Sequence, residues 1–114
     1  MDHKDLEAWK QAICLVEEVY KISANFPRHE MYGLTSQARR AAVSIPSNIS
    51  EGAARNGSKE YNNFLGIALG SLAELETQLI IASRLNYADV KSQLVAVTHV
   101  RSLIIGLRNY IQTK

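Results

Sequence analysis

The sequence predicts an all-α protein: a single domain over residues 1–114, folded as an up-down-up-down antiparallel four-helix bundle with a proline-kinked second helix. Apolar residues recur at intervals of three and four in four separate stretches, the spacing that places side chains on one face of a helix. Short connections at residues 27–32, 56–58 and 86–88 separate these stretches, and connections of this length join antiparallel neighbours. With 114 residues and 46% hydrophobic residues, the chain suits one continuous core.

The first helix is predicted over residues 6–26. Its apolar face is predicted to carry Leu6, Trp9, Ile13, Val16 and Tyr20. A second stripe, formed by Leu15, Val19 and Ile22, widens this face. We therefore expect neighbours on two sides, as in a bundle. We interpret Trp9 as a core anchor in preference to a ligand platform. Phe26-Pro27 ends the helix, because the residue before a proline is disfavoured in the helical region.

The second helix begins after Tyr32-Gly33, and Asn56-Gly57 supplies a left-handed stop. Its predicted apolar line is Leu34, Ala38, Ala41, Ile45 and Ile49. Pro46 interrupts this helix, since its ring removes the hydrogen bond to the Ala42 carbonyl at a cost of about 3 kcal/mol in an ordinary helix interior. We expect a bend there, with water or a hydroxyl of the segment satisfying that carbonyl.

Polar residues surround this proline and could compensate for it: Ser44, Ser47, Asn48, Ser50 and Glu51. Asn48 and Glu51 are predicted to lie on a partly enclosed surface and to form a hydrogen-bonded structural network, because a buried amide or carboxylate needs partners. The alternative is a polar pocket at the Pro46 kink that binds a small molecule.

The third helix is predicted to begin with a Ser58 cap and to end at Asn86. It has the strongest periodicity of the chain, a seam of Tyr61, Leu65, Ala68, Leu72, Leu75, Leu79 and Ala82. Gly66 and Gly70 flank this seam, and each costs about 0.8–1 kcal/mol relative to alanine. We expect a neighbouring backbone, from this chain or another subunit, to pack against them.

The fourth helix is predicted to start at an Asp89 cap and to continue nearly to residue 114. Its apolar residues are Val90, Leu94, Val97, Val100, Ile104, Leu107 and Ile111. Arg101 and Arg108 lie seven residues apart and therefore share one face.

The sequence lacks the patterns that catalysis or metal binding requires. The histidines are scattered, no Glu-x-x-His pair occurs, and Cys14 has no second cysteine with which to bind zinc. No serine has an activating base at a suitable spacing, and no glycine-rich phosphate loop is present. We therefore predict a non-enzyme without metal or cofactor.

The single cysteine and the charged beginning of the chain favour a reduced, cytoplasmic location. The longest apolar run, residues 65–73, is shorter than the ~20 residues of a membrane helix, so we expect no membrane contact.

Positive charge is the remaining functional signal, although the formal net charge is only +2 and acidic and basic segments alternate. The candidate phosphate-binding residues are Arg28, Arg39, Arg40, Arg55, Lys59, Arg101 and Arg108. A solvated face, or salt bridges to the first and third helices, would explain them without a ligand. If they do bind nucleic acid, little base discrimination is expected, since no aromatic-rich motif accompanies them.

Several blocks read together carry a family resemblance: Asp5-Leu6-x-x-Trp9-Lys10, Phe26-Pro27-x-x-Glu30-x-Tyr32-Gly33-Leu34, AAVSIPSNISEG at residues 41–52, Glu60-Tyr61-x-x-Phe64-Leu65 and Gly70-Ser71-x-x-Glu74-Leu75-Glu76. The chain closely resembles the four-helix bundle family encoded by intervening sequences of bacterial 23S rRNA genes, sometimes labelled S23 ribosomal protein. This resemblance covers nearly the whole chain.

The resemblance implies a ring-shaped homopentamer without established catalysis. It also implies that RNA or DNA, and a protein such as a reverse transcriptase, are possible partners. Five copies would repeat the basic segments around a symmetry axis and so strengthen a weak patch. We therefore expect a non-catalytic adaptor associated with nucleic acid. A protein-binding scaffold without nucleic-acid contact and a small-molecule binder at the Pro46 kink are the alternatives.

Overall fold

The computed structural model describes residues 2–113 and contains four long helices. These are α1 (Glu7–Ser23), α2 (Leu34–Ala53), α3 (Ser58–Arg84) and α4 (Lys91–Gln112). Two short 3₁₀ turns, η1 (His3–Asp5) and η2 (Arg28–Glu30), precede α1 and α2, and the described residues form no strand. The all-α prediction of four helices is confirmed.

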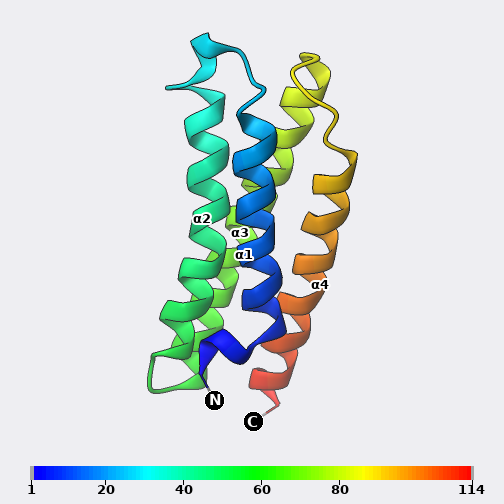
Figure 1. Cartoon of the computed structure of the whole chain (residues 1–114). Coiled ribbons are helices and arrows are strands. Elements are labelled where there is room, and N and C mark those ends of the chain that lie inside the picture. The colour runs from blue at the N-terminus through cyan, green and yellow to red at the C-terminus, as the bar shows by residue number, and fades with distance from the viewer. Residues whose placement is uncertain (1, 114) are drawn as a thin grey trace.

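The helices alternate in direction, as Figure 1 shows by the colour change along the chain. Each helix packs against two others, in the pairs α1–α2, α2–α3, α3–α4 and α4–α1, and the α2–α3 contact is the most extensive. The connections α1–α2 and α3–α4 therefore lie together at one end of the bundle (Figure 1), which we call the double-turn end. The α2–α3 turn lies at the opposite end, with both chain termini.

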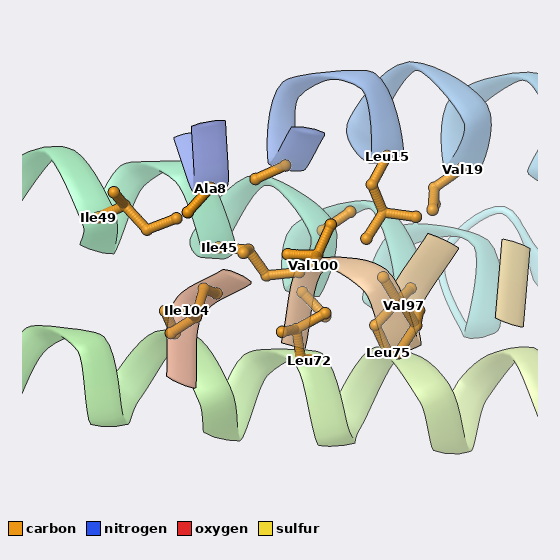
Figure 2. Close-up of a cluster of buried hydrophobic side chains, with 14 of the residues drawn as sticks. Ala8, Leu15, Val19, Ile45, Ile49, Leu72, Leu75, Val97, Val100 and Ile104 are labelled. Carbon is orange, nitrogen blue, oxygen red and sulfur yellow. The ribbon is translucent and has the colours of Figure 1, made fainter. Parts of the chain in front are cut away.

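The core is built from aliphatic side chains of all four helices (Figure 2). The predicted apolar line of α2 is buried throughout, and so is the predicted α3 seam from Leu65 to Ala82. Within α4, Leu94 and Leu107 are only partly buried, while the other predicted core residues are buried. Periodicity therefore identifies the inward faces of these three helices, because the helical period fixes which side chains share a face.

The buried face of α1 confirms only one of the two predicted stripes, that of Leu15, Val19 and Ile22. Its core residues are Ala8, Ala12, Leu15, Val19 and Ile22, whereas the predicted stripe from Leu6 to Tyr20 is partly exposed. Both stripes have helical spacing, so spacing alone does not distinguish them. The buried stripe includes two small residues, Ala8 and Ala12, which let neighbouring helices approach α1 closely. Trp9 packs against the core from its edge, and its ring meets that of His3 at 5.4 Å between centroids.

The region of Pro46 is helical on both sides, and Pro46 itself is buried. The nearby donors bond other carbonyls: Ser47 Oγ that of Val43 at 2.8 Å, Asn48 Nδ2 that of Ser44 at 2.8 Å, and Ser50 Oγ that of Pro46 at 3.0 Å. The hydroxyl part of the expectation for the Ala42 carbonyl is therefore wrong, and a water bound to this carbonyl stays a prediction. Each donor bonds the carbonyl four residues earlier because that carbonyl lies directly beneath it on the helix. The bend at Pro46 stays a prediction.

Two predicted features of the α2–α3 turn are wrong. Gly57 is extended, with φ −161°, and among residues 2–113 the only positive φ outside glycine belongs to Asn86, so Asn56-Gly57 forms no left-handed stop. Gly57 also occupies the N-cap of α3, and Ser58 is the first helical residue and makes no capping hydrogen bond. The extended turn lets α3 begin one residue earlier than a Ser58 cap would allow.

The α3–α4 turn follows the sequence-based expectation more closely. Asn86 has φ 62° just after α3, the left-handed conformation that ends many helices. Asp89 Oδ1 accepts a hydrogen bond from the Lys91 amide at 3.1 Å, although Val90 holds the N-cap position. α1 ends at Ser23, earlier than predicted, and a 3₁₀-type turn follows it.

The glycines of α3 face no backbone atom among residues 2–113. A Cβ added at Gly70 would meet no atom within 4 Å, and one at Gly66 would meet only the Arg108 guanidinium at 3.9 Å. The expectation that a backbone of the same chain packs there is wrong. The close approach lies instead at Gly52 of α2, where an added Cβ would stand 2.9 Å from Phe64 Cβ.

By length and composition alone α3 could cross a membrane, in contrast to the expectation from its longest apolar run. The core helix of a bundle has the same properties, and one face of α3 is the buried seam of this fold.

Candidate nucleic-acid interface

The predicted basic residues lie in three separate parts of the bundle and do not form one cluster. Arg28, Arg39 and Arg40 belong to η2 and the first half of α2, near the double-turn end. Arg55 and Lys59 border the α2–α3 turn at the other end, and Arg101 and Arg108 lie on α4.

The cations at the α2–α3 turn are accompanied by acids. Arg55 pairs with Glu51 at 3.3 Å and with Glu60 at 4.0 Å, and its guanidinium lies over the Phe64 ring at 5.1 Å. Lys59 is exposed and forms no ion pair within residues 2–113. The nearby carboxylates reduce the positive potential at this end.

The two arginines of α4 tie that helix to α3. Arg101 Nη2 bonds Glu76 Oε1 at 2.8 Å, and both side chains are only about a third exposed, at 31% and 34%. Arg108 Nε is buried without a hydrogen-bond partner in the described structure, and its terminal nitrogen lies beside Gly66. These contacts match the salt-bridge alternative for Arg101 better than a phosphate-binding face.

Arg39 fastens α2 to the end of α1. Its Nε donates to Ser23 Oγ at 2.8 Å, Nη2 donates to the Tyr20 carbonyl at 3.3 Å, and the guanidinium lies 4.7 Å from the centre of the Tyr20 ring. All these partners are neutral. Because no carboxylate lies within ion-pair distance of Arg39 among residues 2–113, its positive charge is not compensated locally.

The double-turn end is held together by contacts between its two connections. Tyr87 donates a hydrogen bond to Glu30 Oε2 at 2.9 Å, and its ring packs near those of Phe26 and His29 at centroid distances of 5.9 and 6.3 Å. Glu30 Oε1 also accepts from the Leu34 amide at 3.0 Å. The Leu34 bond first, and then the Tyr87 bond, hold the pKa of Glu30 below its ordinary value, while the hydrogen bond to Glu30 raises the pKa of Tyr87.

Positive charge exceeds negative charge at this end. Its cations are Lys21, Arg28, Arg39, Arg40, Arg84 and Lys91, and its acids are Glu17, Glu18, Glu30 and Asp89, with Lys21 paired to Glu18 at 3.6 Å. Sequence reasoning missed Arg84 and Lys91, which flank the α3–α4 turn. The predicted antiparallel topology could have found them, since it places this turn beside the α1–α2 connection that carries Arg28.

An open groove of about 460 Å³ runs between the end of α1 and the beginning of α2. Its lining consists of Tyr20, Met31, Tyr32, Thr35, Ser36, Arg39, Arg40 and Val43, with no acidic residue. We call it the Tyr32 groove. On the other side of Tyr32, Ser36 and Arg40 lies a second hollow, whose lining includes Glu74. Sequence reasoning did not connect the tyrosines of the Tyr32 groove with the arginines.

The polar residues near Pro46 form a structural network toward α3. Ser44 Oγ lies 2.8 Å from Ser71 Oγ, and Asn48 Nδ2 donates to Ser44 Oγ at 2.9 Å. Glu51 is exposed and pairs with Arg55, so its predicted place in the network is wrong: it lies one helical turn before Arg55, and the network faces α3.

The hollow at Pro46 lies on a different side of α2. Its lining is Trp9, Ile13, Val16, Val43, Pro46, Ser47 and Ser50, from α1 and α2. Asn48 and Ser44 do not line it, so the polar network and the hollow do not combine into the polar ligand pocket that was the alternative prediction. Within residues 2–113 no three His, Cys, Asp or Glu side chains are placed to hold a metal ion.

The fold and the charge distribution together define an antiparallel four-helix bundle with a basic double-turn end. The sequence model of the 23S rRNA-intervening sequence protein family matches residues 4–106. The chain therefore belongs to this family. The resemblance seen in the sequence is thereby confirmed. No curated protein matches the sequence.

Proposed function

We propose that this protein is a non-catalytic, homo-oligomeric cytoplasmic adaptor that binds nucleic acid through its double-turn end. The observation that carries the proposal is the excess of cations there, where Arg28, Arg40, Arg84 and Lys91 are exposed. Membership of a family named for the intervening sequences of 23S rRNA supports an RNA-associated role.

Phosphate neutralisation would supply the affinity. Each phosphate that a protein cation neutralises adds about 0.7–0.9 to the slope of log affinity against log salt. One subunit offers only a few exposed cations, but a ring such as the family resemblance implies would repeat the basic end in every subunit. Exposed apolar residues on α3, including Ile67 and Ile81, support assembly because the single chain leaves these side chains about half exposed to solvent.

The test compares two double variants that each remove two charges. Arg28→Gln with Arg40→Gln neutralises the double-turn end, and Arg55→Gln with Lys59→Gln is the matched control at the other end. Fluorescence anisotropy with a labelled RNA and a labelled DNA, over a salt series, should show weaker binding and a smaller slope for the first variant only. Equal slopes in both variants and the parent would refute the assignment of this end.

A protein-binding scaffold is the second candidate function, because the Tyr32 groove also exposes Tyr20, Met31 and Val43. A protein partner such as a reverse transcriptase could bury these side chains. If the folded parent binds neither RNA nor DNA at low salt, the scaffold is favoured. Light scattering that shows a monomer at micromolar concentration would remove the oligomer from both proposals.

A further inference from the structure

We infer that the Tyr32 groove binds an unpaired stretch of nucleic acid, with one base stacked on Tyr32 and the adjoining phosphates drawn to Arg39 and Arg40. The inference rests on the proposed function and deepens it. It assigns the ligand's strandedness and an aromatic contact, neither of which follows from positive charge alone.

Tyr32 is presented to solvent rather than used for packing. Its side chain is 97% exposed, just before α2 begins, and no ring contact of Tyr32 occurs within the described structure. A tyrosine stabilises a fold by burying its ring, so this one contributes little to the single chain. Both faces of the ring are free to stack on a base.

A polar row connects this ring with a guanidinium. Tyr32, Ser36 and Arg40 follow each other at intervals of four residues, and all three line the Tyr32 groove. Arg40 Nη2 lies 3.5 Å from Ser36 Oγ, so the guanidinium is directed back toward Tyr32. At 1.5 Å per helical residue, the stretch from Leu34 to Arg40 rises about 9 Å, and Tyr32 lies just before it, so the row is long enough for a base and its neighbouring phosphate.

The charges of the groove favour a polyanion over a peptide or a second copy of the chain. Arg39 and Arg40 have only neutral partners in the described structure, and no acidic residue lines the groove. The hollow on the other side of Arg40 contains Glu74, which repels phosphate. A strand that stacks on Tyr32 therefore follows the α1 side of α2.

Stacking on Tyr32 requires an unstacked base, and this requirement selects single strands. In a duplex each base is covered by its neighbours, so a duplex gains only the phosphate contacts. A π-face is common to all bases, so the contact tolerates any sequence. The sequence has no aromatic-rich motif beside the arginines, and the contact proposed here uses one tyrosine, so weak base discrimination is still expected.

The test uses three variants of the full chain: Tyr32→Ala, Tyr32→Phe, and Tyr110→Ala as a control at an exposed tyrosine near the other end of the bundle. The probes are a labelled single-stranded RNA of mixed sequence and the same strand in a duplex, compared by anisotropy. Tyr32→Ala should weaken single-strand binding about 5- to 150-fold and leave duplex binding and the salt slope unchanged. Tyr32→Phe and Tyr110→Ala should bind as the parent does.

Two binding results would overturn the inference: unchanged single-strand affinity of Tyr32→Ala, or an equal loss of affinity for the single strand and the duplex. A Tyr32→Ala particle smaller than the parent in light scattering would also overturn it, because the groove would then be an interface between copies of the chain. In each of these the parent still binds nucleic acid, so the proposed function survives. Failure of the parent to bind either probe at low salt overturns the proposed function and this inference with it.

Discussion

Replacing Gly52 and Gly70 by alanine, one at a time, should change stability in opposite directions. A Cβ at Gly52 would lie 2.9 Å from Phe64 Cβ, 3.0 Å from Tyr61 Cδ1 and 3.3 Å from the Tyr61 carbonyl oxygen. Phe64 Cβ and the Tyr61 carbonyl oxygen are fixed by the α3 backbone, so relief requires α2 and α3 to move apart. At Gly70 the same Cβ would meet no atom within 4 Å.

The magnitudes follow from two competing effects. Overpacking in a close contact costs about 1–3 kcal/mol, and glycine to alanine in a helix interior gains about 0.8–1 kcal/mol. Gly52 is next to the last residue of α2, where the helical gain is smaller, so Gly52→Ala should lower the free energy of unfolding by about 1–2 kcal/mol. In the single chain, where this face of α3 is open, Gly70→Ala should raise it by about 0.8–1 kcal/mol.

Urea unfolding followed by circular dichroism measures both changes, from the midpoint and the slope. Each titration should be run at two protein concentrations, since the stability of an oligomer depends on concentration. A Gly52→Ala protein as stable as the parent would refute the close α2–α3 approach. Destabilisation by Gly70→Ala would show that the open face of α3 is occupied in solution.

Three further predictions concern contacts at other places in the bundle. Arg101→Gln breaks the bond to Glu76 and should cost about 0.2–1 kcal/mol in urea unfolding, with RNA affinity unchanged at constant salt; weaker RNA binding would contradict the structural role. Asn48→Leu should lower the free energy of unfolding by about 1 kcal/mol in the same assay. An unchanged free energy of unfolding would mean that the Asn48 amide does not stabilise the fold. Because Glu30 has a lowered pKa in the folded state, its stabilisation is present above the unfolded pKa and is lost as pH falls through the folded pKa. The melting temperature of Glu30→Gln should therefore lie below that of the parent at neutral pH and converge with it in acid, and a difference that persists in acid would contradict this account.

Helical periodicity predicts much of this fold, since it depends only on spacing along the chain. The inward faces of α2 and α3 follow from spacing alone. The face of α1 does not, because two adjacent stripes have the same spacing, and packing chose the one with Ala8 and Ala12. The capping of α3 also escaped prediction, since Gly57 adopts an extended conformation that its neighbours in sequence do not dictate.

The candidate site depends far more on packing between distant segments. The arginines can be identified from the sequence. In the folded chain, however, Arg101 forms an ion pair with Glu76, 25 residues earlier, which neutralises its charge. Arg84 and Lys91 join Arg28 at one end only because antiparallel helices bring the two connections together. A helix face is a local property of the backbone, whereas the potential at a surface sums Coulomb interactions whose distances are set by the packing of all four helices. The residues that can meet a ligand were therefore settled by the tertiary arrangement.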